Sequence, residues 1–328
     1  MPRVAVCGIG SIGSMVVKAV LERGWVVSGA IDSDPSKVGR DLGEVASLGR
    51  PLGVEVTDSA DSFRGADLAF VTTTSRLEDA SERVLEAVRA GANVISSCEE
   101  LAYPWIVDED LSEDIDGEAR SAGVTVVGAG VNPGFLMDAL PAFISLPCLR
   151  VDRFRAMRVI DASKRRAPFQ KKVGAGLSVR EFEEAIRSGR ITAHVGLAQS
   201  TALVARALGW PIDSIREEGP EPVLADREVD TGVVRVGPGL VAGVRQRALL
   251  SSGGVDRVEL MFEAYVGAPD QRDEVEVEGL PPVRMRIEPC VHGDWGTVGV
   301  LVNLAPAVVA AEPGLTTVVD LMRLVRRF

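Results

Sequence analysis

The chain contains, from Arg3 to Val20, the sequence RVAVCGIGSIGSMVVKAV. A short apolar run is followed at once by glycines with GxGxxG spacing and then by a helix-forming stretch, which predicts a strand, a tight turn and a helix. In such a turn Gly8 permits the bend, Gly10 lets the backbone approach phosphates, and Gly13 lets the helix pack on the strand. A pyrophosphate can bind against the start of this helix. The candidate cofactor-binding residues of the turn are Gly8, Gly10, Ser11, Ile12 and Gly13.

A second expected strand, from Trp25 to Ile31, ends at Asp32. An acid at this point accepts hydrogen bonds from ribose hydroxyls, so the two segments together predict a nicotinamide dinucleotide site. The alternative is a structural turn in another α/β protein. Ser33, Lys37 and Arg40 follow closely enough to meet a 2′-phosphate, whereas Asp32 favours an unphosphorylated ribose. The expected cofactor is therefore NAD or NADP, unless Lys37 and Arg40 are merely solvated.

Length and composition limit the class of protein. A chain of 328 residues suits two domains, and its formal charge of −11 disfavours nucleic acid or an anionic membrane as a partner. With only two histidines, a histidine-rich metal site is excluded, and we expect no metal. The four cysteines lack CxxC spacing, which is typical of buried thiols in a reducing compartment. The start of the chain has no signal-peptide pattern, so we expect a cytoplasmic protein.

Two further strands of a parallel sheet are expected at 67–72 and 93–97. Polar residues follow each of them: Thr72, Thr73 and Thr74 after the first, Glu99 and Glu100 after the second. Because ligands bind beyond the carboxyl ends of parallel strands, the threonines are candidates for lining the cofactor and the glutamates for catalysis. Alternatively, the threonines cap the helix expected from about Arg76 to Ala90, and the acids are placed to favour a helix dipole.

An acidic helix from Asp108 to Ala122 and a strand from Val124 to Val127 lead into a second glycine-rich segment, 128–138. This segment is a plausible place for the backbone to pass the nicotinamide, and it marks a domain boundary. We assign residues 1–134, completed by 295–328, to a dinucleotide-binding domain, and 135–294 to a substrate-binding and dimerisation domain. Asn132 and Asn303 are two further cofactor-binding candidates.

The second half changes to longer strands of alternating polarity, beginning with Asp152 to Asp161. This alternation is typical of a half-exposed antiparallel sheet, to which 233–236, 256–266 and 273–287 add strands, with a turn at Pro281 and Pro282. Helices are expected at 178–188 and at 191–208, the latter carrying His194. The helix expected at 298–311 is apolar nearly all round, so it must be buried, most simply by returning to the first domain.

A basic segment stands out in this acidic chain, with five cations between Lys164 and Lys172. It is either an anion site for a substrate carboxylate or the cofactor phosphates, or a solvated or dimer-interface cluster. A carboxylate would be gripped by Arg165, Arg166 or Lys172, whereas a simple amine would need only an apolar pocket. A histidine beside apolar residues, such as His194, is more often a partly buried residue with its hydrogen-bonding groups paired than a catalytic base. The substrate-binding candidates are Phe135, Met137, Arg165, Arg166, Phe169, Gln170, Lys172, His194 and Leu197.

Five segments together resemble the 2,4-diaminopentanoate dehydrogenase family and the native amine dehydrogenases related to it. They are 8–13, 93–104 (NVISSCEELAYP), 128–135 (GAGVNPGF), 165–172 (RRAPFQKK) and 193–200 (AHVGLAQS). The resemblance implies a dihydrodipicolinate-reductase-like α/β fold. That fold has an N-terminal Rossmann domain with a parallel sheet, a second α+β domain with an open mixed or antiparallel sheet, and a C-terminal helix that returns to the first domain. It also implies a homodimer.

The same resemblance implies NAD(P)-dependent oxidative deamination of an amine to a ketone and ammonia, reversible as reductive amination. The family's catalytic glutamate falls in the Cys98-Glu99-Glu100 segment, on either glutamate. In this reaction the amine carbon gives a hydride to nicotinamide C4, and water adds to the iminium that forms. A nearby carboxylate can stabilise this cation and act as general base. Whether the amine is 2,4-diaminopentanoate or a simple alkyl amine stays open.

Two other functions are compatible with the sequence. One is an imine reductase of the dihydrodipicolinate-reductase type, although the paired histidines of that family are missing. The other is a non-catalytic NAD(P)-sensing protein, against which the Glu99-Glu100 pair and the intact second domain argue.

Overall fold

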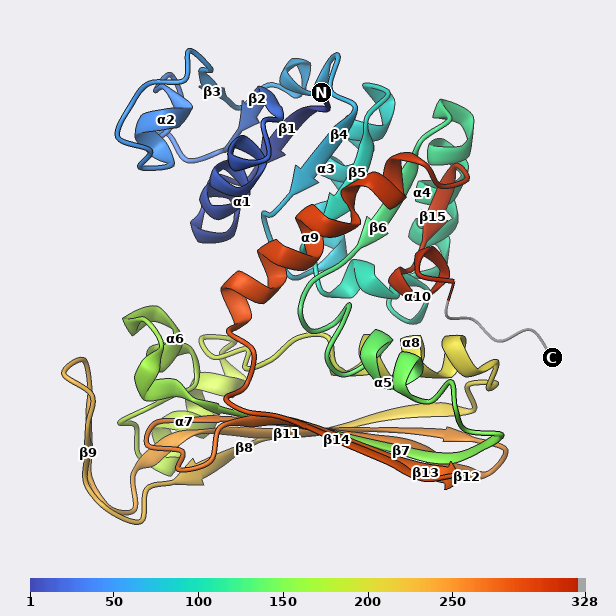
Figure 1. Ribbon diagram of the computed structural model, residues 1–328. Coiled ribbons are helices and arrows are strands. Elements are labelled where there is room, and N and C mark those ends of the chain that lie inside the picture. Colours follow the sequence, from blue (N-terminus) through green and yellow to red (C-terminus); the bar gives the residue numbers. More distant parts are fainter. Residues whose placement is uncertain (324–328) are drawn as a thin grey trace. The chain divides into compact units, whose positions relative to one another are not determined.

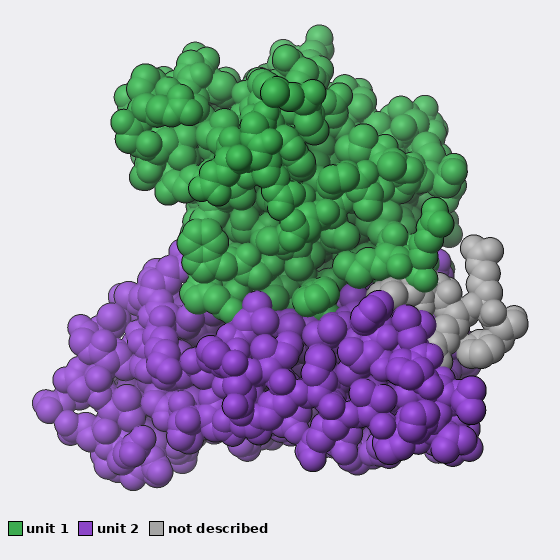
Figure 2. Space-filling view, viewed as in Figure 1, with its two compact units in different colours: residues 1–135, 292–326 green, residues 136–291, 327–328 purple. Residues whose placement is uncertain are grey.

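The computed structural model describes residues 1–323, and the chain within it divides into two compact units. Unit 1 contains residues 1–135 and the segment that begins at His292, and unit 2 is the continuous stretch Leu136–Val291 (Figure 2). The sequence-based boundaries were 134 and 295. Residues 324–328, which that assignment gave to the first domain, lie outside the described residues.

Unit 1 is built on a seven-stranded parallel sheet with the order β15-β6-β5-β4-β1-β2-β3. Its strands are β1 Arg3–Cys7, β2 Val26–Ile31, β3 Val56–Thr57, β4 Leu68–Val71, β5 Asn93–Ser96, β6 Thr125–Gly128 and β15 Gly314–Thr316. The chain runs outward from β1 through β2 and β3, and then resumes with β4 on the other side of β1. The sheet therefore has its topological switch point between β1 and β4, where ligands of open α/β sheets bind.

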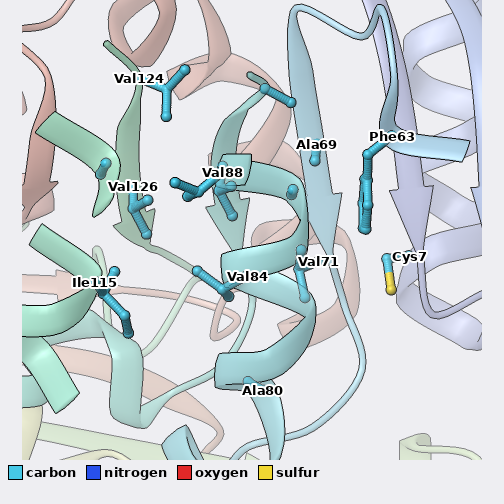
Figure 3. Packing of buried hydrophobic residues seen from close by; sticks show 14 of the residues in the cluster. Cys7, Phe63, Ala69, Val71, Ala80, Val84, Val88, Ile115, Val124 and Val126 are labelled. Carbon is cyan, nitrogen blue, oxygen red and sulfur yellow. The ribbon is translucent and has the colours of Figure 1, made fainter. Parts of the chain in front are cut away.

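Helices cover both faces of this sheet (Figure 1). They are α1 Ser11–Glu22, α2 Leu42–Val45, α3 Leu77–Arg89, α4 Glu109–Ala122, α9 Gly293–Val309 and α10 Val318–Leu321, with 3-10 turns η1 Ala60–Phe63, η2 Glu100–Ala102 and η3 Pro104–Ile106. On one face, Val84 and Val88 of α3 and Ile115 of α4 pack with Val126 of β6 in a fully buried apolar cluster (Figure 3). Removing this apolar surface from water is the main force that holds the layers together.

The apolar helix near the end of the sequence belongs to unit 1, as predicted. Helix α9 packs against α1 and against β5 and β6, and Leu301 and Val308 on it are buried. The chain then adds β15 to the edge of the sheet beside β6. Within the described residues, no helix is long and apolar enough to cross a membrane.

Unit 2 contains a six-stranded sheet with the order β14-β13-β7-β12-β11-β8. Its strands are β7 Arg150–Asp161, β8 Ser214–Leu224, β11 Val241–Ser252, β12 Val255–Tyr265, β13 Arg272–Leu280 and β14 Val283–Ile287. The sheet is mixed, because β12 runs parallel to β7 while the other neighbours are antiparallel. On β12 the side chains of Val258, Leu260 and Phe262 are buried, and those of Glu259 and Glu263 alternate with them on the other face.

Helices lie over one face of this second sheet (Figure 1). The helical elements of unit 2 are α5 Ala139–Ile144, η4 Ala162–Lys164, α6 Ala167–Lys172, α7 Val179–Arg187 and α8 Leu197–Leu208. Helix α8 packs on β11 and β12 and is itself packed against α5. Helix α7 begins with a capping box in which Ser178 and Glu181 satisfy each other's backbone N–H groups.

Two sequence-based expectations for unit 2 are wrong. Residues 233–236 were expected in the main sheet. Instead, β10 Arg235–Val236 pairs with β9 Val229–Asp230 in a separate two-stranded hairpin. The N–H of Thr231 donates to the carbonyl oxygen of Val234 and so closes the turn of this hairpin. The helix expected within 191–208 to carry His194 begins only at Leu197. Ala193 and Gly196 have φ of 51° and 108°, which no right-handed helix contains, so His194 lies in a loop.

Candidate functional site

The glycine turn after β1 has the geometry expected of a dinucleotide-binding turn. Gly8 has φ of 87°, and a Cβ there would lie 2.7 Å from the carbonyl oxygen of Thr72. A Cβ on Gly13 would overlap the carbonyl oxygen of Gly8, so only glycine lets α1 approach the strand this closely. A Cβ on Gly10 would meet no atom within 4 Å. The turn therefore leaves open space over Gly10.

The N-terminus of α1 is suited to an anion. Its N-cap is Gly10, no side chain caps the helix, and its first turn holds no acidic residue. By contrast, α3 and α4 begin with acidic pairs. The first N–H groups of α1, those of Ser11 and Ile12 among them, and the positive end of the helix dipole thus face the space over Gly10, which fits the pyrophosphate of a nicotinamide dinucleotide.

Thr72 stabilises the turn itself. Its hydroxyl donates to the carbonyl oxygen of Gly8 at 2.8 Å and lies 3.2 Å from that of Cys7. The hydroxyl proton is therefore used within the protein. Thr73 is exposed, and the Thr74 hydroxyl accepts a weak bond from the Arg76 N–H at 3.4 Å. For Thr73 and Thr74 the cofactor role stays a prediction.

Asp32 is anchored to the glycine turn. Its Oδ2 accepts from the N–H of Ile9 at 2.7 Å and pairs with Lys37 Nζ at 2.8 Å, while its Oδ1 accepts from the N–H of Asp34. Lys37 therefore lies at the site and compensates the charge of the buried Asp32. Arg40 instead forms an exposed pair with Glu44 at 3.8 Å.

The two glutamates after β5 have different surroundings. Glu100 is buried, and its Oε2 accepts from the N–H of Leu77 at 2.7 Å while its Oε1 pairs with Arg76 at 2.5 Å. It thereby caps α3, a helix earlier in the chain, in agreement with the structural alternative considered for the acids. Both carboxylate oxygens of Glu100 are engaged in this cap.

Glu99 is only half-buried and is the N-cap residue of the 3-10 turn η2. The turn is fixed from two sides. Ser96 Oγ bonds both the carbonyl oxygen of Val71 and the N–H of Cys98, and a Cβ on Gly128 would overlap the backbone of Leu101. Strand β5 is two places from β1, about 10 Å at the usual strand spacing. Glu99 therefore lies at the same edge of the sheet as the glycine turn.

Burial disfavours a nucleophilic role for the two cysteines near this edge. It raises the pKa of the Cys98 thiol, and likewise that of Cys7, to about 12. The thiolate, which is the reactive form, is therefore disfavoured at neutral pH.

In unit 2, Gln170 holds the basic segment in place. The buried amide donates to the carbonyl oxygen of Arg165 at 2.9 Å and accepts from the hydroxyl of Thr231 at 2.7 Å. The Arg165 guanidinium lies 4.6 Å from the ring centroid of Phe169, while Lys172 is exposed. Gln170 therefore orders the loop rather than offering its amide to a ligand.

His194 is half-buried, and its ring stacks on that of Phe262 with centroids 4.5 Å apart. Burial, and then the charges of Lys172 and Arg158, lower its pKa to about 3, so the imidazole is neutral at physiological pH. Met137 and Leu197, two of the expected pocket residues, are fully buried.

Asn303 is not brought to the glycine turn. Its side-chain oxygen accepts from Arg23, and Arg23 also donates to the carbonyl oxygen of Val302 at 3.1 Å. Arg23 follows the last residue of α1, which is about 18 Å long, so this contact lies at the opposite end of the helix from the turn. Asn132 is buried in the segment after β6, and Phe135 is half-buried.

Comparison with known proteins decides the family. Residues 135–325, more than half of the chain, match the model of the 2,4-diaminopentanoate dehydrogenase C-terminal domain. The chain belongs to the 2,4-diaminopentanoate dehydrogenase family.

Named relatives extend this match along the chain. The 2,4-diaminopentanoate dehydrogenase of Acetoanaerobium sticklandii is 28% identical over 97% of this chain and 93% of its own length. The amine dehydrogenase of Streptomyces virginiae is 28% identical over 96% and 95%. The structure of an amine dehydrogenase from Mycobacterium smegmatis superposes with a TM-score of 0.84 at 28% identity, covering 99% of this chain and 97% of that one.

More distant structures share the fold alone. The myo-inositol 2-dehydrogenase of Lactobacillus plantarum has a TM-score of 0.57 at 14% identity, with 98% of this chain and 94% of that one covered. This member of the 2,4-diaminopentanoate dehydrogenase family is accordingly an oxidoreductase with a Rossmann-type first unit, and it uses a nicotinamide cofactor.

Several residues that shape the sites were not found from the sequence. Gln246, Arg158 and Asp273 are buried polar side chains on the unit 2 sheet. A signal was present for Arg158, because it is a charge at an inward position of an alternating strand, between the buried Ala156 and Ile160.

Proposed function

We propose that this chain is an NAD(P)-dependent amine dehydrogenase, which converts an amine to a ketone and ammonia and catalyses the reverse reductive amination. The observation that carries the proposal is the division of labour between Glu99 and Glu100. Glu100 is committed to the cap of α3, whereas Glu99 is held on a rigid turn at the cofactor edge of the sheet. The names of the family and of its relatives support the same reaction.

A nicotinamide dinucleotide held by the glycine turn and Asp32 would supply the acceptor for the hydride that leaves the amine carbon. The carboxylate of Glu99 stabilises the positive charge of the resulting iminium and takes the proton of the water that adds to its carbon. It returns this proton to the nitrogen, and the C–N bond then breaks to release ammonia. The remaining hydroxyl proton passes to the carboxylate and on to solvent as the ketone forms. The rigid setting of η2 keeps the carboxylate oriented through these steps, which lowers the cost of reorganisation.

The cofactor site supports the use of both NAD and NADP. Asp32 accepts from the hydroxyls of an unphosphorylated ribose, and Lys37, which already lies 2.8 Å from Asp32, offers a counter-charge to a 2′-phosphate. Ser33 and Arg40 are exposed and contribute less.

For the substrate we favour an amine that carries a carboxylate. Arg165 and Lys172 of the basic segment supply cations in unit 2, and the Acetoanaerobium relative is named for 2,4-diaminopentanoate. Arg166, beside them, is the N-cap residue of α6. A simple alkyl amine is the second candidate. The aromatic side chains of Phe169 and Phe262 in unit 2 and the name of the Streptomyces relative favour it.

A homodimer through the outward face of the unit 2 sheet completes the proposal. That face interleaves both charge signs. Glu259, for example, pairs with Arg153 at 2.6 Å, Arg155 at 3.3 Å and Arg247 at 2.6 Å. A two-fold interface needs such a self-complementary patch. Sedimentation of the protein at increasing salt concentration tests this arrangement. A protein that is monomeric at all salt and protein concentrations contradicts it.

The experiment that tests the reaction follows absorbance at the reduced-nicotinamide band with NAD⁺ or NADP⁺ and a panel of amines. Glu99→Gln is expected to abolish turnover while cofactor binding persists, and Glu100→Gln is expected to keep measurable turnover. If both variants keep near-wild-type rates, the proposal fails. Reductive turnover of a ketone that does not require ammonia points to an imine reductase, and tight cofactor binding with no turnover of any amine points to a sensor.

A further inference from the structure

One row of side chains crosses the unit 2 sheet on its helix-covered face. Gln246 of β11 lies opposite Phe262 of β12, Phe262 lies beside Arg158 of β7, and Arg158 lies opposite Asp273 of β13. All four side chains are buried, with exposures of 9%, 5%, 2% and 4% in that order. Three polar residues in one buried row of a sheet need partners, because unpaired polar groups are costly away from water.

Half of this row holds His194. The amide of Gln246 accepts from the N–H of His194 at 2.7 Å and donates to its carbonyl oxygen at 3.1 Å. The neighbouring Phe262 carries the imidazole ring, with an interplanar angle of 16°. Gln246 thus fixes the main chain and Phe262 fixes the ring.

The loop that contains His194 needs such support. Ala193 has φ of 51°, a left-handed conformation that is unfavourable for a non-glycine residue and persists only where the surroundings impose it. The two hydrogen bonds from Gln246 to the next residue are positioned to impose it. The strain indicates that this placement of His194 is maintained against the local preference of the chain.

The other half of the row is an ion pair that holds a second loop. Arg158 Nη1 and Asp273 Oδ1 are 3.2 Å apart. Asp273 accepts from the N–H of Val291 at 2.7 Å, and Arg158 donates to the carbonyl oxygen of the same residue. Arg158 is therefore fixed next to Phe262, the residue on which the ring of His194 stacks.

Charged groups on two elements act on His194. Arg158 of β7, partly compensated by Asp273 of β13, and Lys172 of α6 disfavour a second positive charge, whereas Gln246 of β11 and Phe262 of β12 are uncharged. These cations add to the effect of burial, and together they lower the pKa of the imidazole to about 3.

We propose that Gln246 is a positioning residue that, together with Phe262 and Arg158, presents His194 to the substrate as an uncharged hydrogen-bonding group. The part of this inference that concerns substrate rests on the amine dehydrogenase function proposed above. An imidazolium would repel a cationic amine or iminium, whereas a neutral imidazole can hydrogen-bond to the amine or polarise the ketone oxygen. The buried setting of the ring on Phe262, together with the charges of Lys172 and Arg158, favours this neutral form.

The chain offers a direct test because His194 and His292 are its only histidines. Their ring signals are followed by NMR as the pH is lowered, with His292→Gln used for assignment. In the wild type the His194 signal is expected not to titrate between pH 8 and the onset of acid unfolding. A His194 signal that titrates near the ordinary pKa of about 6.5 overturns the inference, whatever reaction the enzyme catalyses.

Variants then separate positioning from packing. Gln246→Leu is expected to release His194, so that its signal titrates closer to the ordinary value, and to lower kcat/KM for the amine at least tenfold with a new loss of activity at acidic pH. Gln246→Glu keeps an acceptor for the His194 N–H and is expected to retain more activity. The matched control is Arg245→Gln, since Arg245 is the adjacent residue of β11 and pairs with Glu263 on the opposite face.

The control is expected to leave the His194 signal and the pH profile unchanged. The NMR spectrum of Gln246→Leu shows whether unit 2 is still folded. If this folded variant changes neither the titration of His194 nor kcat/KM, the inference is wrong. If the titrations behave as expected but no amine is oxidised by the wild type, the proposed function fails while the positioning of His194 stands.

Discussion

The carboxylate of Glu100 accepts a hydrogen bond from the N–H of Leu77 at 2.7 Å and so closes the start of α3 from 23 residues further along the chain. Its other oxygen pairs with Arg76, so that one side chain joins the turn after β5 to the turn after β4. The edge of the unit 1 sheet where β4 and β5 end is therefore held together by a glutamate to which we assign no part in the proposed reaction.

The cap formed by Glu100 predicts that removing this side chain destabilises the protein more than removing an ordinary first-turn acid of a helix. Glu100→Ala removes the cap and is expected to lower the free energy of unfolding by about 1–2 kcal/mol, as measured by urea denaturation. The control is Glu109→Ala, which changes an exposed first-turn acid of α4 and is expected to cost less than about 0.5 kcal/mol. Equal losses in the two variants would show that Glu100 does no more than an ordinary first-turn acid.

Two glycines of the same turn are expected to fail in different ways. In Gly13→Ala the added methyl overlaps the carbonyl oxygen of Gly8, so the variant is expected to lose about 1–3 kcal/mol of stability. In Gly10→Ala the methyl meets no protein atom, so stability is kept. The methyl occupies the space over the turn, and dinucleotide binding is expected to weaken at least about tenfold. Unfolding curves measure the first effect, and fluorescence titration with reduced cofactor measures the second. Unchanged cofactor affinity in Gly10→Ala would contradict a pyrophosphate site at this turn.

Lys37 is expected to decide how well the phosphorylated cofactor binds. Lys37→Ala removes a positive charge 2.8 Å from Asp32 and leaves that carboxylate to repel a 2′-phosphate. NADPH affinity is expected to fall about tenfold relative to NADH, a difference of about 1.4 kcal/mol. Arg40→Ala serves as the control, because the exposed pair of Arg40 with Glu44 lies outside the Asp32 contact. A parallel loss for both cofactors would contradict a 2′-phosphate contact.

The lowered pKa of His194 also predicts how stability depends on pH. The folded protein keeps this imidazole neutral down to about pH 3, whereas the unfolded chain binds a proton below its ordinary value of 6.5. The contribution is therefore fully present above about pH 6.5 and is lost as the pH falls toward 3. His194→Gln is expected to flatten this part of the profile by up to about 1.4 kcal/mol per pH unit. Thermal melting of both proteins from pH 7 to pH 4 measures it, and parallel curves would show that His194 is free to protonate.

The fold of unit 1 could be predicted from the sequence because a parallel sheet buried on both faces is made of short apolar runs. The segment from Arg3 to Cys7 and the glycines after it identified β1, the turn and α1 directly. In unit 2 the strands β8 and β11 were not predicted. Strand β8 contains Gly219 and Pro220 and is largely exposed, so it lacks the residues that favour a strand in isolation.

The site was predicted at the level of segments and less well at the level of roles. The Cys98-Glu99-Glu100 segment lies at the same edge of the sheet as the glycine turn, as expected, but the sequence left the roles of the two glutamates open. The deciding contact, from Glu100 to Leu77, joins residues that are distant in the sequence. Gln170 shows the same limit, because its carbonyl and hydroxyl partners are set by the fold and turn an expected ligand into a loop support.

The return of α9 and β15 to unit 1 has a consequence for how the protein is made. Unit 1 is assembled from two stretches of chain, and its sheet gains β15 only after all of unit 2 has been translated. At usual elongation rates this interval lasts roughly 10–40 s, during which the outer edge of β6 and the α9-facing side of α1 stay uncovered on the ribosome. Unit 2, a continuous stretch, can complete its own sheet in that time. Unit 1 therefore begins to form before unit 2 but completes its sheet only after unit 2 has been made.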